Sequence, residues 1–130
     1  MADVICLGLA CADVMARPVE SFPERGKLEL LPTLEIHLGG LAAVAAAIIA
    51  KLGGSVAFMG KLGSDGFGDY CVGAPENCGA DLRHLQRTTT EGTPATVVLV
   101  SNDGERTFLH HAGCSRTLRE TDIDTEKFHG

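Results

Sequence analysis

Hydrophobic and polar residues alternate in blocks along the chain, and these blocks predict a mixture of strands and helices. Residues 3–9 form a continuous apolar run, which predicts a strand buried on both faces. Residues 55–59 form a second such run, and residues 96–100 form a β-branched run typical of a strand. Because helical patterns separate these runs, the order of elements favours an α/β domain with parallel strands.

Two helices are predicted between these strands. Apolar residues with helical spacing occupy one face of residues 41–52, and the Gly53–Gly54 pair that follows is a typical left-handed helix end. A second helix is expected to begin just after Ser64 or Asp65, either of which can serve as its N-cap. Pro75 is expected to break or kink that helix, because a proline ring clashes with the preceding turn.

The remaining segments have the composition of loops and exposed strands. Residues 16–26 are rich in proline and charge and predict a loop, whereas residues 27–38 alternate imperfectly and predict an exposed strand with a break at Pro32. Asn-Asp-Gly at residues 102–104 predicts a turn that returns residues 106–111 as the partner of the β-branched strand. The last ten residues are polar and acidic, and we expect them to be poorly ordered.

Composition narrows the classes of function. Apolar residues make up 45% of the 130 residues, enough to bury a core. The net charge of −6, part of it in an acidic tail at residues 119–130, argues against a nucleic acid or an anionic membrane as partner, because both bind basic patches. The apolar run at residues 38–50 is shorter than the roughly 20 residues that cross a bilayer.

The five cysteines indicate the compartment. Their number is odd and no two form a CxxC pair, which predicts reduced thiols in a cytoplasmic protein and no zinc site. The apolar start of the chain carries Asp3 and lacks the basic residues of a signal peptide, so a buried strand is the better interpretation.

Two sequence features are candidates for ligand binding. Asp13 follows the first predicted strand, where α/β proteins bind ligands, and its carboxylate can accept hydrogen bonds from sugar hydroxyl groups. Gly39 and Gly40 precede a predicted helix, where backbone can approach a ligand closely and free N–H groups point outward. On spacing alone, Asp13 can equally be a turn or capping residue, and the glycines an ordinary strand-to-helix turn.

The other motifs give weaker evidence for a functional site. The loop at residues 63–68 lacks the glycine spacing of a dinucleotide or phosphate loop and is interpreted as structural. His110 and His111 are adjacent in a predicted strand, so their side chains point to opposite faces and do not share a metal. No arrangement for nucleophilic catalysis is supported, and no catalytic or metal-binding residue is assigned.

Taken together, four segments resemble the PfkB, or ribokinase-like, family of carbohydrate kinases. They are GLACAD at residues 8–13, GGLAAVAAAIIAKLG at 39–53, VAFMGKLGSDGFG at 56–68 and TPATVVLVSNDGERTFLHHAGCSRTL at 93–118. The resemblance implies the N-terminal part of a Rossmann-like three-layer α/β/α domain with a small β lid. The core would comprise residues 3–13, 39–92 and 112–118, and the lid residues 14–38 and 93–111.

The resemblance also implies a function. Family members phosphorylate a sugar or nucleoside hydroxyl group with ATP and Mg²⁺, and the residues matching Asp13, Gly39 and Gly40 contact the sugar. The lid can form a homodimer contact. The sequence departs from the family at Val44, where an asparagine usually binds substrate, and at Cys114–Ser115, where another asparagine is usual.

The family signature D-T-x-G-A-G-D, which supplies the catalytic base and the anion hole, has no counterpart in the 130 residues. We therefore expect the ATP site to be absent from this chain, and the chain alone to be inactive. Three hypotheses remain: the sugar-binding part of a kinase, a non-catalytic module that binds a small polyol or dimerises through its lid, or a truncated fragment without function.

Overall fold

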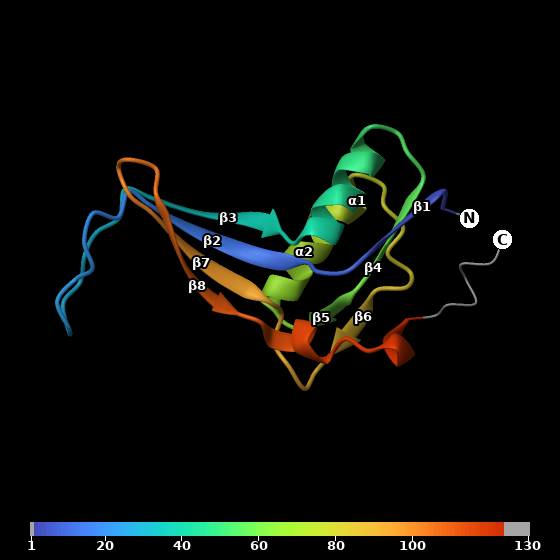
Figure 1. Ribbon diagram of the computed structural model, residues 1–130. Helices are drawn as coiled ribbons and strands as arrows, with labels where there is room; N and C mark the ends of the chain where they lie inside the picture. Colours follow the sequence, from blue (N-terminus) through green and yellow to red (C-terminus); the bar gives the residue numbers. More distant parts are fainter. Residues whose placement is uncertain (1, 124–130) are drawn as a thin grey trace.

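The computed structural model describes residues 2–123. Within them, eight strands form three small sheets, and two α-helices accompany the sheets. Residues 124–130, which hold most of the predicted acidic tail, lie outside the described residues. A sheet of four strands projects from a part that contains both helices, as Figure 1 shows. The predicted α/β class is confirmed.

The helical part is built around two parallel strand pairs. β1 (Val4–Leu7) pairs with β4 (Val56–Met59), and β5 (Lys61–Gly63) pairs with β6 (Gln86–Thr88). α1 (Leu41–Lys51) contacts β1 and β4 as well as α2. The core contains Phe58, Leu62 and two alanines of α1, Ala43 and Ala46, whose small side chains allow the helix to approach the strands closely.

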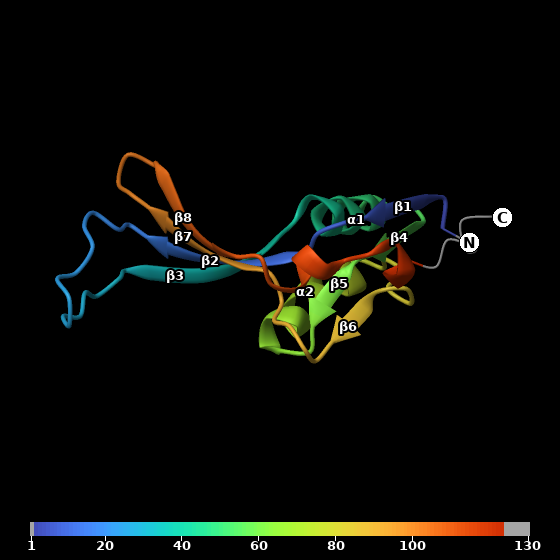
Figure 2. The same ribbon diagram turned by 60° about the horizontal axis from the view of Figure 1, so that its bottom comes forward.

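The projecting sheet has the strand order β3-β2-β7-β8. Its strands are β2 (Cys11–Arg17), β3 (Thr33–Gly39), β7 (Ala95–Val100) and β8 (Arg106–His111). β2 is antiparallel to β3 and parallel to β7, and β7 and β8 form the predicted hairpin. In the turned view of Figure 2 this sheet extends away from the helices, with the loop at residues 18–32 at its far end.

Several predicted elements are confirmed. α1 lies within the predicted helix, and Gly53 after it has the positive φ of 86° that a left-handed helix end requires. α2 (Gly66–Asn77) begins after Asp65, whose carboxylate accepts a hydrogen bond of 2.8 Å from the Gly68 N–H group. That carboxylate also accepts bonds from the backbone and hydroxyl groups of Thr93, which tie the helix start to the chain before β7.

Three predictions were wrong in part. β1 is not buried on both faces, since Val4 is 41% and Leu7 46% exposed, because β1 pairs with β4 alone among the described strands. Pro75 neither breaks nor ends α2, which continues to Asn77, because the proline lies in the last turn, where few backbone bonds depend on it. The strand predicted at residues 27–38 begins only at Thr33, after Pro32.

The short 3-10 helices η1 (Gly113–Thr117) and η2 (Glu120–Asp122) follow β8. Lys61 links this end of the described chain to β5, because its ammonium donates to the Thr117 carbonyl and lies 3.3 Å from the Asp122 carboxylate. None of the helices in residues 2–123 is long and apolar enough to cross a membrane.

Candidate functional site

Asp13 lies inside β2 and not in a turn after the first strand. Only residues 8–10 separate β1 from β2. Asp13 therefore lies on the projecting sheet, beyond the carboxyl end of β1. Its register partners are His37 on β3 and Thr96 on β7, and Thr96 is in turn paired with His110 on β8. Because residues in register share a face of a sheet, these four side chains form one polar row.

Gly39 makes room for the Asp13 carboxylate. A Cβ atom at Gly39 would lie 2.4 Å from Oδ2 of Asp13 and 2.8 Å from its Cγ, so any larger residue would displace the carboxylate. Gly40 is required for a different reason. Its φ is 87°, and a Cβ atom there would lie 2.4 Å from the backbone oxygen of Leu9.

The start of α1 lies beside this carboxylate. Gly40 is the N-cap, and no side chain caps the helix or places an acidic group in its first turn. The first N–H groups of a helix have no intrahelical partner, and they favour polar or negatively charged ligand atoms. The structure therefore brings Asp13, Gly39 and Gly40 together at one place, although the sequence separates them by 26 residues.

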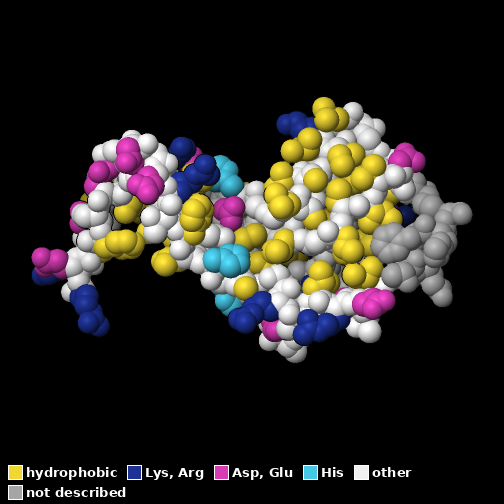
Figure 3. All heavy atoms as spheres, in the orientation of Figure 1, with side chains coloured by type: hydrophobic (Ala, Val, Ile, Leu, Met, Phe, Trp, Pro, Cys, Tyr) yellow, Lys and Arg dark blue, Asp and Glu magenta, His cyan; other side chains and the backbone are white. Residues whose placement is uncertain are grey.

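Asp13 and Gly40 border an open pocket of about 480 Å³ between the projecting sheet and the helical part. In Figure 3 the surface is hollowed between these two parts. The lining residues are Leu7, Gly8, Leu9, Cys11, Asp13, Gly40, Leu41, Ala42, Thr96 and His110.

A chain of hydrogen bonds crosses the polar wall of the pocket. The Cys11 thiol lies 3.4 Å from Oδ1 of Asp13 and 3.3 Å from Oγ1 of Thr96, and Oγ1 of Thr96 lies 3.0 Å from Nδ1 of His110. Burial raises the pKa of the Cys11 thiol to about 11, while the Thr96 bond lowers it and Asp13 raises it. The thiol therefore stays protonated near neutral pH and can donate to the carboxylate.

Three residues of the pocket were not predicted from the sequence to bind a ligand: Cys11, Thr96 and His110. A signal was present, because a hairpin centred on the predicted turn at residues 102–104 places Thr96 opposite His110. Val44, at the position of the family's usual asparagine, is not among the residues that line the pocket, although it lies in the first turn of α1. Within residues 2–123, no group of three or more potential ligands could hold a metal ion.

Comparison with known proteins places these features in context. A model described as pfkB family carbohydrate kinase matches residues 1–128. The fructokinase of Salmonella typhimurium is 32% identical over 105 residues, which are 78% of this chain and 34% of the relative. The probable fructokinase-4 of Arabidopsis thaliana is 37% identical over 80 residues, which are 62% of this chain and 24% of the relative.

Solved structures of sugar kinases are also similar to this chain. The Arabidopsis thaliana ribokinase complexed with ribose and ATP superposes with a TM-score of 0.79 at 29% identity, over 86% of this chain and 36% of that one. A fructokinase with bound ATP from Xylella fastidiosa gives a TM-score of 0.79 at 28% identity, over 98% and 39%. The ribokinase-like fold is thus confirmed, and the chain spans about a quarter to two-fifths of the length of these relatives.

The pocket does not fit the nucleotide that these relatives bind. ATP carries several negative charges, which proteins neutralise with Lys, Arg or a metal ion. The lining has a carboxylate and a histidine but neither Lys nor Arg. The fit is better for an uncharged ligand rich in hydroxyl groups.

Proposed function

Because the chain belongs to the pfkB family of carbohydrate kinases, we propose that it forms the sugar-binding part of an ATP-dependent sugar kinase. One observation carries the proposal: the Asp13 carboxylate occupies the space that a side chain at Gly39 would need, at the start of α1, which no side chain caps. A carboxylate accepts two or more hydrogen bonds, and neighbouring hydroxyl groups of a sugar supply such donors.

The substrate class follows from the relatives and from the pocket. Fructokinases and a ribokinase are among the similar proteins, so a ketose or a pentose is the first choice. A nucleoside is the alternative, because its ribose carries the same hydroxyl groups. In either case Asp13 would orient the sugar by accepting hydrogen bonds from its hydroxyl groups, and the backbone at Gly40 would approach the ring closely.

We further propose that the 130-residue chain alone does not transfer a phosphoryl group. The D-T-x-G-A-G-D signature that the family resemblance implies for catalysis does not occur in this sequence, and the pocket does not fit ATP. ATP, and the Mg²⁺ that accompanies it, would therefore be bound by residues other than those described.

The exposed apolar surface supports the interpretation as part of a larger domain. Parallel strands are normally covered on both faces, yet Val4 and Leu7 of β1 are more than 40% exposed, and Leu41 of α1 is 92% exposed. Figure 3 shows hydrophobic side chains gathered over this region. For a chain without a partner, this surface would favour aggregation, as the hypothesis of a truncated, non-functional fragment requires.

The opposite face of the projecting sheet supports a homodimer. Ile36, Val14, Val97 and Leu109 lie in register across the four strands, on the face opposite Asp13. Ile36 is 39%, Val97 40% and Leu109 58% exposed. We propose that a second copy covers this apolar row.

We also propose a cytoplasmic location, which the five unpaired cysteines support.

Titration calorimetry with fructose, ribose and adenosine tests the sugar-binding proposal. We expect at least one of them to bind the purified chain, and Asp13→Asn to abolish that binding while the chain stays folded. A coupled assay for ADP should detect no ATP use with any of the three ligands. Absence of binding to all of them overturns the proposed function, whereas binding without ATP use also fits the non-catalytic module.

Sedimentation equilibrium tests the homodimer, with Leu109→Asp as the variant. Dimers of the wild-type chain and monomers of the variant are expected. If both chains sediment as monomers at tens of micromolar, the projecting sheet is not a dimer contact.

A further inference from the structure

His110 occupies a position in the fold that gives its imidazole a defined orientation. It is the register partner of Thr96, and both side chains lie on the face of the projecting sheet that carries Asp13. The bond between Nδ1 of His110 and Oγ1 of Thr96, 3.0 Å long, fixes one edge of the ring. Among the described residues, the other ring nitrogen, Nε2, has no hydrogen-bond partner.

The hydrogen-bond chain continues from Thr96 to Asp13 through the buried Cys11 thiol. β7 separates β2 from β8, so the backbones that carry Asp13 and His110 are two strand spacings, or about 9.5 Å, apart. Both side chains border the same pocket. Their polar ends can therefore contact different hydroxyl groups of one small molecule.

The remaining wall of the pocket offers no comparable group. It consists of the backbone around Gly8 and Gly40 and of apolar side chains such as Leu7, Leu9 and Ala42. Val44, where the family resemblance implies an asparagine, has no side-chain hydrogen-bonding atom. A ligand that binds Asp13 thus has to find its second side-chain contact on the projecting sheet.

We propose that His110 is a specificity-determining residue, whose Nε2 binds a second hydroxyl group of the sugar held by Asp13. The proposal rests on the proposed function, because it assigns a further contact in the same pocket. The ligand class is a sugar with two hydroxyl groups far enough apart to reach both side chains. Thr96 acts through His110, as a positioning residue that holds the ring.

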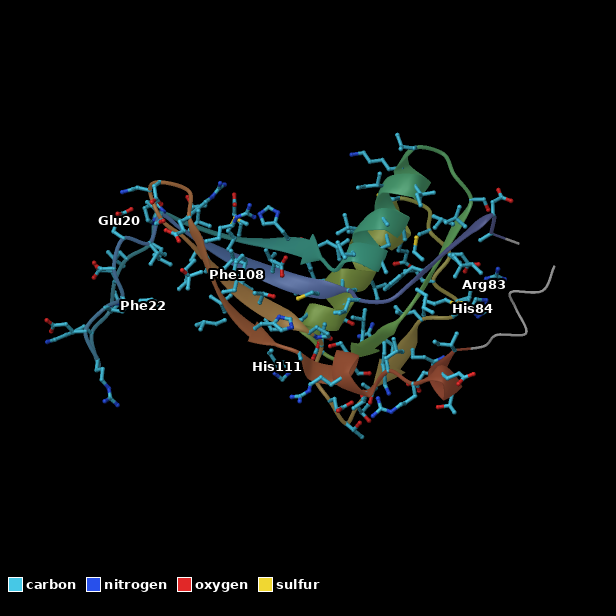
Figure 4. The ribbon with its side chains drawn as sticks, in the orientation of Figure 1. Glu20, Phe22, Arg83, His84, Phe108 and His111 are labelled. Carbon is cyan, nitrogen blue, oxygen red and sulfur yellow. The ribbon has the colours of Figure 1, made fainter. Side chains whose placement is uncertain are left out.

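Matched variants of the two adjacent histidines provide the test. Phe108 and His111 lie on opposite sides of β8 (Figure 4), and His110 shares the face of Phe108 because it is two residues away. His110→Phe keeps a ring of similar shape without nitrogen atoms, and His110→Gln keeps a polar group of similar reach. His111→Phe changes the opposite face and serves as the control.

Titration calorimetry would use the 130-residue chain with fructose, ribose and their single-deoxy analogues. We expect His110→Phe to weaken binding of the full sugar about tenfold, the value of one hydrogen bond, and His110→Gln to stay within about threefold of wild type. The analogue that lacks the contacted hydroxyl group should bind the wild type and His110→Phe equally. A structural role for His110 would instead weaken every analogue alike.

The outcomes separate this inference from the proposed function. If Asp13→Asn abolishes sugar binding while both His110 variants bind like the wild type, the inference is overturned and the proposed function stands. If His110→Phe lowers the affinity for every deoxy analogue by the same factor, His110 does not bind a particular hydroxyl group, and the inference is also overturned. If the wild-type chain binds none of the sugars, both fail together.

Discussion

Substituting Gly39 by alanine should strongly weaken sugar binding while the chain keeps its fold. The new Cβ atom would lie 2.4 Å from Oδ2 of Asp13, which is less than any non-bonded contact allows. The atoms that must move are the end of a flexible side chain, so the carboxylate can rotate away without displacing backbone. Gly39 lies in an ordinary strand conformation, because its φ is not among the positive values.

The magnitudes follow from this geometry. A hydrogen bond to a charged group contributes about 1.5–3 kcal/mol, so displacement of the Asp13 carboxylate should weaken sugar binding about 10- to 150-fold. The alanine reduces the entropy of the unfolded chain, which stabilises a protein by about 0.4–1 kcal/mol and offsets the cost of rotating Asp13. The free energy of unfolding should therefore change by less than about 1 kcal/mol.

The neighbouring Gly40→Ala should instead destabilise the fold. Its Cβ atom would lie 2.4 Å from the backbone oxygen of Leu9 and 2.7 Å from the Cα atom of Ala10, and neither can rotate away. The φ of 87° adds a strain of about 1–3 kcal/mol. Gly53→Ala, with a φ of 86° and no atom within 4 Å of the new Cβ, isolates the cost of the backbone conformation alone.

Urea unfolding gives the three free energies, and titration calorimetry with the sugar that binds the wild type gives the affinities. We expect Gly40→Ala to be less stable than Gly53→Ala, and Gly39→Ala to be the most stable of the three yet the weakest folded binder. Wild-type affinity in Gly39→Ala would refute the assignment of Asp13 to the sugar. A Gly39→Ala chain that unfolds as readily as Gly40→Ala would refute the claim that the carboxylate moves freely.

Three further predictions concern the stability and the thiols. Gly73→Ala, inside α2 with open space around the new Cβ, should stabilise the chain by about 0.5–1 kcal/mol in urea unfolding, and a loss of stability would contradict this. Burial raises the pKa of Asp65, but bonds from Thr93 and Gly68 outweigh it and leave the pKa lowered. The Asp65 carboxylate therefore contributes to the free energy of unfolding above its unfolded-state pKa of about 4, and this contribution is lost as the pH falls through the lower folded-state pKa. Asp65→Asn should make the free energy of unfolding depend less steeply on pH in the acid range. Burial raises the pKa of Cys11 to about 11 and of Cys71 to about 12, so iodoacetamide at pH 8 should label both slowly until urea is added, as mass spectrometry would show.

The hydrophobic pattern predicted those elements whose stability is local. α1 has helical spacing and a glycine end, and the β7–β8 hairpin has a turn sequence at its centre, so each can be read from neighbouring residues. β2 was not predicted, because CADVMAR mixes small, apolar and charged residues. It is a strand because β3 and β7 pair with it on both sides, and those partners are distant in sequence.

The candidate site divides in the same way. Asp13, Gly39 and Gly40 were chosen from residue type and position, whereas the reason for Gly39 became visible only when the Asp13 carboxylate was located beside it. For Cys11 the sequence predicted only a reduced thiol, because its bonds to Asp13 and Thr96 depend on the register between β2 and β7. The burial of β1 was overestimated. An apolar run indicates that a strand can be buried, but not whether other elements cover it.

The two faces of the projecting sheet depend on one another. Side chains of a strand alternate, so the register that points Asp13 to the pocket also points Val14 to the apolar face. A slip of one residue in β2 would exchange the two faces and place the carboxylate among Ile36 and Val97. The slip would bring the charge of Asp13 against apolar side chains, which is unfavourable, so the apolar row disfavours the slip even without contacting the sugar. A partner that covers this row would increase the resistance, because it adds apolar area that the correct register alone can bury.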